Sequence, residues 1–403
     1  MTPDLIKGMR LIAHDDLLGF GGVGEGMSIQ ATRDGRRILW LAHEGPPKNF
    51  TGVDVTDPRR PRVVVQTELP NRHVRSNSLE TSGDLMAVAY QVLEHGQTPA
   101  GIEMFDISDP ENPRSISFFD CSGPFSRGVH QLWFVDGETV HFGGGSADFT
   151  PKNKLDDQPY RMLDVRDPAR PREIGRWWIP GTREGDPEPE PARLAIDTGF
   201  RAHNTNVYPT RPDRAYVGMI DGGGYVLDIA NPSAIKPVSH WNPNPPFPGF
   251  THTVMPLFSR DLLVFTHECV MDDGADWPKL TWIVDARRED NLVPLSILPM
   301  PDVEEYAPKG GRFGCHNVHE NTPRETSFQS DTLIFSSLFN GGVRVHDISD
   351  PTAPKEVAAF VPPAPAGSRV PSAQINDVHV DENGVAYAVD RHTGGLYVLE
   401  LDI

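Results

Sequence analysis

Short apolar-rich stretches recur along the chain, and most of them end in an acidic residue followed by a proline turn. Clear copies are Gly52–Pro58, Gly101–Pro110, Arg161–Pro168, Gly224–Pro232 and Gly342–Pro351, with weaker ones at Trp282–Arg288 and Gly395–Ile403. An apolar-rich run of this length is typical of a strand, and the residue before a proline is restricted to extended or turn backbone. The pattern predicts one β unit repeated along the chain.

The acidic position in each copy gives the period of the repeat. Its members are Asp54, Asp106, Asp164, Asp228, Asp285, Asp347 and Glu400. Successive members are 52, 58, 64, 57, 62 and 53 residues apart. This spacing fits a four-stranded propeller blade and is longer than most helical repeats.

Each unit offers two strands before the marked one and one strand after it. In the fourth unit these are His203–Tyr208 and Arg214–Met219, followed by Pro237–Trp241. The other predicted final strands are Arg62–Leu69, Ser115–Phe119, Glu173–Ile179, Val293–Leu298 and Lys355–Val361. We therefore expect four strands per blade, running from the axis to the rim.

The seventh unit stops after its third strand, while Met9–His14 is a strand without a unit of its own. Pairing the two would close the ring and leave no strand edge exposed. The prediction is an all-β chain, one seven-bladed β-propeller over residues 1–403 with 3+1 closure. The expected blades are 15–70, 71–120, 121–180, 196–243, 248–300, 312–362, and 370–403 together with 4–14. An open β-solenoid or two sandwiches are the alternatives.

Composition narrows the class of protein further. With 37 glycines and 39 prolines in 403 residues, long helices are disfavoured, and apolar runs such as Leu262–Phe265 are too short to span a bilayer. A net charge of −19 would repel nucleic acid. Three cysteines and an N-terminus without a secretory pattern favour a reducing compartment. We expect a cytoplasmic protein that binds neither membranes nor nucleic acid.

Strands such as Tyr225-Val-Leu-Asp228 resemble those of the LVIVD-repeat β-propeller family. The resemblance covers nearly the whole chain and implies the propeller, but says little about a reaction. The layout is more distantly similar to the selenium-binding protein and methanethiol oxidase family, also propellers with histidine-lined axial sites. No motif of that family matches residue by residue.

Histidines occupy the same position in four consecutive blades. The predicted inner strands of blades 3 to 6 begin His130-Gln-Leu-Trp, His203-Asn-Thr-Asn, His252-Thr-Val-Met and His316-Asn-Val-His. Blades 7 and 2 have Asn376 and Asn77 there, and blade 1 offers only Glu25 or Gly26. Since propeller sites lie at the axis, four such imidazoles would converge on one point.

Converging neutral imidazoles suit a transition metal better than calcium or magnesium. We expect one ion held by His130, His203, His252 and His316, with Fe(II) favoured and Mn, Cu or Zn as alternatives. In arrangement only, the site is similar to that of carotenoid-cleaving oxygenases, whose inner strands supply four histidines to Fe(II). The alternative is four histidines that bond between blades or to axial water. His319 and His379 are expected to form a second, deeper pair.

Acid–base candidates lie at the ends of predicted second strands, in the repeated pairs His43-Glu44 and His267-Glu268. Glu44 or Glu268 could orient a ligand imidazole or act as a general base, and His319 could also move a proton. Further candidates at matching loops are Asp148, Asp221, Asn340 and the Arg391-His392 pair.

Arginines gather just before the predicted inner strands: Arg75, Arg127, Arg201, Arg312 and, further off, Arg369. They would form a positive mouth for a carboxylate, phosphate or sulfate group of a small-molecule substrate. The alternative is that they pair with acids such as Glu80, Glu184 or Asp377.

The sequence thus favours a metal-dependent oxidoreductase with oxygenase-like chemistry on a small, anionic organic substrate. A metal-assisted lyase or hydrolase is the alternative within the same site. A non-catalytic propeller that binds a protein partner is the alternative from another class, although such a scaffold has no use for buried histidines in register.

Overall fold

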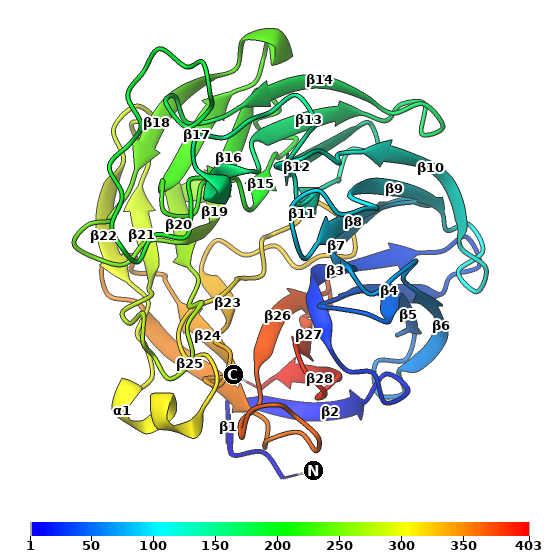
Figure 1. Ribbon diagram of the computed structural model, residues 1–403. Coiled ribbons are helices and arrows are strands. Elements are labelled where there is room, and N and C mark those ends of the chain that lie inside the picture. Colours follow the sequence, from blue (N-terminus) through cyan, green and yellow to red (C-terminus); the bar gives the residue numbers. More distant parts are fainter. Residues whose placement is uncertain (1, 403) are drawn as a thin grey trace.

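The computed structural model describes residues 2–402, which form four-stranded sheets arranged around a central axis (Figure 1). Within these residues the sheets make seven blades, each running from an inner strand to the rim, as predicted. Blades 1 and 2 are also joined by one pair of residues, His43 and Ser76. The all-β propeller is therefore confirmed.

The first five blades follow the chain in order. Blade 1 comprises β3 (Val23–Ala31), β4 (Arg37–His43), β5 (Lys48–Asp54) and β6 (Arg62–Glu68). Blade 2 comprises β7 (Val74–Ser82), β8 (Leu85–Val92), β9 (Gly101–Asp106) and β10 (Arg114–Asp120). Blade 3 comprises β11 (Val129–Trp133), β12 (Thr139–Gly144), β13 (Tyr160–Asp164) and β14 (Arg172–Trp177). Blade 4 comprises β15 (Thr205–Asn206), β16 (Arg214–Gly218), β17 (Gly224–Asp228) and β18 (Lys236–Trp241). Blade 5 comprises β19 (Thr251–Leu257), β20 (Leu262–His267), β21 (Thr281–Asp285) and β22 (Val293–Ile297).

Blade 6 departs from the prediction at its inner edge. Its regular strands are β23 (Leu333–Ser337), β24 (Val343–Asp347) and β25 (Lys355–Val361), and β1 (Leu5–Lys7) pairs with β25 at the rim. The expected inner strand 316–319 is not regular. It is held to β23 by bonds from the His316 amide to the Ser337 carbonyl (3.0 Å) and from the His319 amide to the Phe335 carbonyl (2.9 Å).

Blade 7 closes the ring with strands from both ends of the chain. It comprises β26 (Ile375–Val380), β27 (Val385–Asp390), β28 (Leu396–Leu401) and β2 (Met9–Asp15). The strand β2 pairs antiparallel with β28, which places the blue and red ends of the chain side by side (Figure 1). This confirms the 3+1 closure. Of residues 4–14, which were expected to complete blade 7, β2 belongs to that blade, whereas β1 pairs with β25 of blade 6.

In blades 1 to 6, the repeated acid has a local structural role at the end of the third strand. The carboxylate of Asp54 accepts the amide of Thr56 (3.0 Å), and that of Asp347 accepts the amide of Ser349 (2.7 Å). Such bonds start the turn toward the last strand of the blade. The acidic residue is therefore conserved from blade to blade within this chain as a turn former.

The spaces between blades are filled by apolar side chains from facing sheets. Trp40 and Trp133 are buried there, and Nε1 of Trp133 donates to the carbonyl of Val207 in the next blade (2.7 Å). Helical segments are short: α1 (Val303–Tyr306) and the 3-10 turns Lys154–Asp156, Pro232–Ala234, Phe258–Arg260 and Ala307–Lys309. Among residues 2–402, no helix has the length and apolar character needed to cross a membrane.

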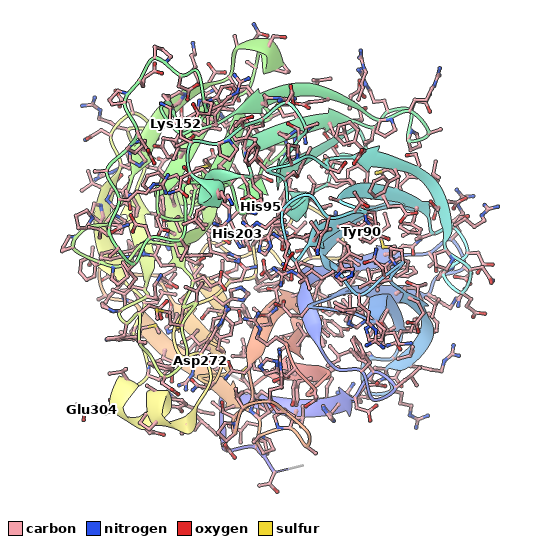
Figure 2. All side chains as sticks on the ribbon, in the orientation of Figure 1. Tyr90, His95, Lys152, His203, Asp272 and Glu304 are labelled. Atoms are coloured by element: carbon pink, nitrogen blue, oxygen red, sulfur yellow. The ribbon has the colours of Figure 1, made fainter. Side chains whose placement is uncertain are left out.

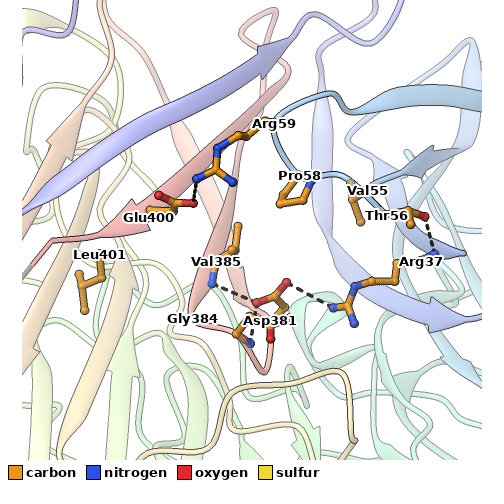
Figure 3. Close-up of a pocket in the computed structure, with 11 residues that line it drawn as sticks. Arg37, Val55, Thr56, Pro58, Arg59, Asp381, Gly384, Val385, Glu400 and Leu401 are labelled. Carbon is orange, nitrogen blue, oxygen red and sulfur yellow. Dashed lines mark hydrogen bonds and ion pairs between the residues drawn. The ribbon is translucent and has the colours of Figure 1, made fainter. Parts of the chain in front are cut away.

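A cavity of about 420 Å³ lies where blade 7 meets blade 1 (Figure 3). Its arginines are paired across the seam: Arg37 binds Asp381 (3.3 Å) and Glu382 (2.6 Å), and Arg59 binds Glu400 (2.6 Å). These ion pairs join the first and last blades and so support the closure of the ring.

Candidate metal centre

The inner strands are bulged where they pass the axis. The pairing register shifts between Val129 and Leu132 in blade 3, between Thr251 and Thr253 in blade 5, and between Val23 and Met27 in blade 1. His130, His252 and Glu25 lie within these three irregularities. A bulge leaves a residue unpaired and turns its side chain in a new direction, here toward the axis.

Four histidines converge on the carboxylate of Glu25. Their Nε2 atoms lie from a Glu25 oxygen at 3.6 Å for His130, 3.8 Å for His203, 3.4 Å for His252 and 3.7 Å for His316. Neighbouring ring centroids along this series are 4.5, 4.0 and 4.6 Å apart. His203 lies near the centre of the ring of blades (Figure 2). The four rings predicted to share one point are therefore brought together.

The opposite ring nitrogens are all hydrogen-bonded. The Nδ1 atoms of His130, His203, His252 and His316 contact Gln91 Oε1 (2.9 Å), Asn204 Oδ1 (2.9 Å), Thr253 Oγ1 (2.7 Å) and the Asn376 carbonyl, respectively. Three of these partners are carbonyl oxygens, which only accept, and the Thr253 hydroxyl itself donates to Asn317 Oδ1 (2.9 Å). In its neutral form, each imidazole therefore carries its proton on Nδ1 and turns an Nε2 lone pair to the axis.

Three of the four inward-facing Nε2 atoms lack a hydrogen-bond partner among the described residues. The Nε2 atoms of His203, His252 and His316 are buried without a hydrogen-bond partner among residues 2–402. Burying an unpaired polar atom costs about 1–3 kcal/mol, so three together at one point call for a ligand. A transition-metal ion fits, because it takes neutral imidazole nitrogens whose far nitrogens are fixed by acceptors.

Burial sets the protonation of most of these rings. It lowers the pKa of His130, lowers that of His203 to about 4 and lowers that of His252 to about 3. Burial also works to lower the pKa of His316, but the carboxylates of Glu268 and Glu25 outweigh it and the pKa is raised. Three of the four imidazoles are thus held neutral at pH 7, as metal ligation requires.

Glu25 is the residue of this cluster that sequence reasoning left without a role. At the position of the histidines, blade 1 offers only Glu25 or Gly26, and neither continues the histidine pattern, so register is the one signal in the sequence that points to Glu25. Its placement depends on close packing: a Cβ on Gly24 would lie 2.5 Å from the Asn77 carbonyl oxygen, and one on Gly26 would lie 2.2 Å from the Leu79 nitrogen. The two glycines let β3 lie against β7 and hold Glu25 at the axis.

Glu268 lies beside the same nitrogens. Its oxygens are 3.7 Å from His316 Nε2 and 3.9 Å from His203 Nε2, and Arg312 Nη1 donates to it at 2.7 Å. Burial favours the neutral acid, but His316 and Arg312 outweigh it and lower the pKa of Glu268. Glu268 is therefore ionised and lies at the edge of the cluster. Together these residues form a buried histidine–carboxylate site that could hold a metal ion.

Glu44 is placed one step further out. Its Oε1 accepts from Arg75 Nη1 (2.7 Å) and from Arg391, and these cations outweigh burial and lower the pKa of Glu44. Arg75 also donates to Gln91 Oε1 at 2.7 Å, the acceptor that holds His130. Glu44 thus reaches the cluster through a hydrogen-bonded chain and does not face the imidazole nitrogens.

His319 lies with His379, their ring centroids 5.3 Å apart, as the expected deeper pair. Both nitrogens of His319 are engaged by backbone: Nε2 donates to the Phe328 carbonyl (2.8 Å) and Nδ1 accepts from the Val380 amide (3.1 Å). A ring bonded in this way holds two segments together. His319 is therefore not among the residues that we propose for proton transfer.

The arginines expected at the mouth are mostly paired. Arg75 binds Glu44, and Arg127 makes two bonds to the Asp157 carboxylate (2.7 and 2.9 Å). Arg201 donates to the carbonyls of Leu155 (3.2 Å) and Thr198 (2.5 Å). Of the four, Arg312 is the one that lines a pocket near the cluster.

Two polar networks extend from the histidines toward the far side of the ring. Beyond Thr253, the amide of Asn317 donates to Asp377 Oδ1 (3.2 Å). In the second network, the side-chain amide of Asn204 donates to Glu320 Oε1 (2.6 Å). Burial raises the pKa of Asp377 and raises that of Glu320 to about 7. These networks fix the acceptors that orient His252 and His203.

The fold and the site together define a seven-bladed β-propeller with a buried histidine–carboxylate cluster on its axis. Two segments, residues 213–241 and 338–361, match the LVIVD repeat, and they cover β16–β18 and β24–β25. Among curated proteins, none matches the chain. The matched segments show the repeat in blades 4 and 6.

The fold is similar to that of the Myceliophteria thermophila Cps50 (Swd1) β-propeller domain, with a TM-score of 0.55 and 12% sequence identity. The alignment covers 93% of this chain and 96% of that one. At this identity the likeness concerns the fold alone. The comparisons do not support the expected resemblances to selenium-binding proteins or carotenoid-cleaving oxygenases.

Proposed function

We propose that the chain is a metal-dependent enzyme with one transition-metal ion on the propeller axis. The ion would be held by His130, His203, His252 and His316, with Glu25 as a fifth donor. The observation that carries the proposal is the set of three buried, unpaired Nε2 atoms whose opposite nitrogens are all fixed by acceptors. The three buried cysteines are unpaired, which supports a cytoplasmic site of action.

The donor set favours Fe(II), with Mn, Cu or Zn as the other candidates. Four imidazoles and one carboxylate are nitrogen and oxygen donors of intermediate character, and the cluster includes no thiolate among the described residues. If the ion took six ligands, these five protein donors would leave one position for a further ligand. A bound ion of this kind would bind and activate dioxygen, water or a polar group of the substrate.

The protein residues would prepare the site for oxidative chemistry on a small, anionic organic substrate. His203, His252 and His316 are at most 1% exposed, whereas Glu25 and Glu268 are 8% and 5% exposed. His130 is the most exposed member, with 14% of its side chain accessible, so substrate would approach from the side of His130 and the two carboxylates. Burial on the other sides excludes bulk water and strengthens the electrostatic interactions inside.

A metal-assisted lyase or hydrolase is the second candidate, and the position of Glu268 favours it. This carboxylate is ionised, is held by Arg312 and lies within 4 Å of two imidazole nitrogens. It could accept a proton from water or substrate beside the ion. In the oxidative version the same residue would serve as a hydrogen-bond acceptor for the substrate.

Metal analysis with an oxygen test decides between these functions. We expect about one transition-metal ion per purified chain, lost in a His203→Ala variant together with dioxygen-dependent activity. Activity that persists without oxygen would replace the oxidative version by the lyase or hydrolase. If the chain binds no metal and tolerates the replacement of all four histidines, the proposal fails and a non-catalytic scaffold remains.

A further inference from the structure

A second pocket, of about 370 Å³, lies among blades 5, 6 and 7 on the side of Glu268 and Glu44. Its lining comes from the segment after β20, the segment before the inner edge of blade 6, and the segments that flank β26 and β27. Asp272, one of the lining residues, is labelled in Figure 2. This volume is within the range of small-molecule sites.

Arginine dominates the lining. Arg312, Arg369 and Arg391 contribute three positive charges, against the single carboxylate of Asp272. Glu268 and Glu44 bind Arg312 and Arg391 from behind the lining, so an anion would be bound through Arg369 and through the remaining N–H donors of the other two guanidinium groups.

Two of these guanidinium groups are held in place but keep donors to spare. Arg312 uses Nη1 for Glu268 and the Cys269 carbonyl, and Arg391 uses Nη2 for Glu44. The Nε and Nη2 of Arg312, and the Nε and Nη1 of Arg391, donate to no acceptor within residues 2–402. Both groups also lie over the ring of Phe339, at 5.3 and 5.6 Å from its centroid. The donors are therefore pre-oriented.

The pocket adjoins the cluster through the same two arginines. Arg312 donates to Glu268, whose oxygen lies 3.7 Å from His316 Nε2. Arg391 binds Glu44, which connects through Arg75 to Gln91 and His130. An anion bound here would lie next to the carboxylates that form the more exposed side of the metal site.

We propose that this pocket binds the carboxylate group of the substrate, so that the substrate is a small organic acid. The two-point geometry of guanidinium matches a planar carboxylate. Phosphate sites commonly use a helix N-terminus, a glycine-rich loop or a lysine, and the lining residues include none of these. The assignment rests on the proposed function for the reaction, but the binding itself does not require the metal.

The test measures binding of succinate to the metal-free, full-length protein at constant ionic strength, by calorimetry or by thermal shift with chloride as the reference. We expect saturable binding that weakens about fivefold or more in Arg369→Gln, because one exposed charge-assisted contact is worth roughly 1 kcal/mol. Arg369 is exposed, so this change leaves the fold intact. Arg391→Gln should weaken binding at least as much.

The matched control is Arg59→Gln. Arg59 also lines a pocket, the one at the seam of blades 1 and 7, but it lies away from the cluster and pairs with Glu400. The Arg59→Gln variant should bind succinate as the unchanged protein does. Equal binding by all variants, or tighter binding of inorganic phosphate than of succinate, would overturn the proposal.

The outcome separates this inference from the proposed function. If the chain fails to hold a metal yet binds succinate through Arg369, the anion pocket stands and the enzyme proposal falls. If the chain holds a metal but binds no carboxylate, the pocket assignment falls and the metal site stands.

Discussion

The Nε2 atom of His252 lies 3.4 Å from Oε2 of Glu25, and neither atom has a hydrogen-bond partner among residues 2–402. The other nitrogen of His252 is occupied by Thr253, so this ring can offer only its inward lone pair. A buried carboxylate facing an unprotonated imidazole is stable only when a cation lies between or beside them. This relationship underlies the first prediction.

Replacing Glu25 with glutamine keeps its size and removes its charge. We expect metal affinity to fall about tenfold or more, since a donor next to the ion is lost. A chelator competition measures the affinity, with Glu382→Gln at the blade 1–7 seam as the control. Unchanged affinity in the Glu25 variant would count against this residue as a donor.

Thr253→Val tests the acceptors behind the histidines. The change keeps the shape but removes the oxygen that holds His252 Nδ1 and donates to Asn317. Metal affinity should fall about 10- to 100-fold and stability by about 1–3 kcal/mol. The matched control is Thr205→Val, since the buried hydroxyl of Thr205 has no partner among residues 2–402. If both variants bind metal alike, Thr253 does not orient the ligand.

Gly26→Ala tests the packing that positions Glu25. An added Cβ would lie 2.2 Å from the Leu79 backbone nitrogen, so β3 must move away from β7. We expect a stability loss of about 1–3 kcal/mol in chemical denaturation, together with weaker metal binding. A Cβ on Gly45 meets nothing within 4 Å, so Gly45→Ala should change neither quantity. A Gly26 variant with full affinity would show that Glu25 is not fixed by this contact.

Glu320 predicts a dependence of stability on pH. Burial raises its pKa from 4.5 to about 7, so the folded state favours the neutral acid. The contribution of neutral Glu320 to the free energy of unfolding is complete below pH 4.5 and is lost as the pH rises through 7. Glu320→Gln in the metal-free protein should therefore gain stability relative to the unchanged protein between pH 5 and pH 8, by up to about 3 kcal/mol.

For Glu382 we expect the opposite dependence of stability on pH. There the bond to Arg37 outweighs burial and lowers the pKa, so the charged form is favoured. Glu382→Gln should lose stability relative to the unchanged protein as the pH rises from about 3 to about 5, across the ordinary glutamate pKa of 4.5, and denaturation at these two pH values measures the change. A shift of the same sign in both variants would contradict the assignment of these pKa directions.

Deleting residues 1–15 tests the closure of the ring. The truncated chain lacks β1 and β2, so the edge of β28 is left unpaired and apolar side chains of blade 7 are exposed. We expect the free energy of unfolding to fall by more than about 3 kcal/mol and the protein to aggregate. A deletion of residues 1–3 keeps both strands and is the control. An unchanged unfolding midpoint in the longer deletion would argue against this closure.

The sequence by itself determined the repeat and what depends on it. The acids from Asp54 to Asp347 form local turns, so their spacing gave the number of blades and the missing strand of the last one. The register of His130, His203, His252 and His316 follows from the same repeat. Local hydrogen bonds and strand periodicity are properties that a linear pattern preserves.

Tertiary structure alone decided which further groups join the four histidines at the axis. Glu25 joins the histidines because a bulge and two glycines let β3 approach β7, a contact between blades that no local pattern records. Arg312 lines the anion pocket while Arg127 is bonded to Asp157, although both precede the inner edge of their blades. Side-chain pairing in a closed ring depends on neighbours from distant parts of the chain, and these are known only once the blades are placed.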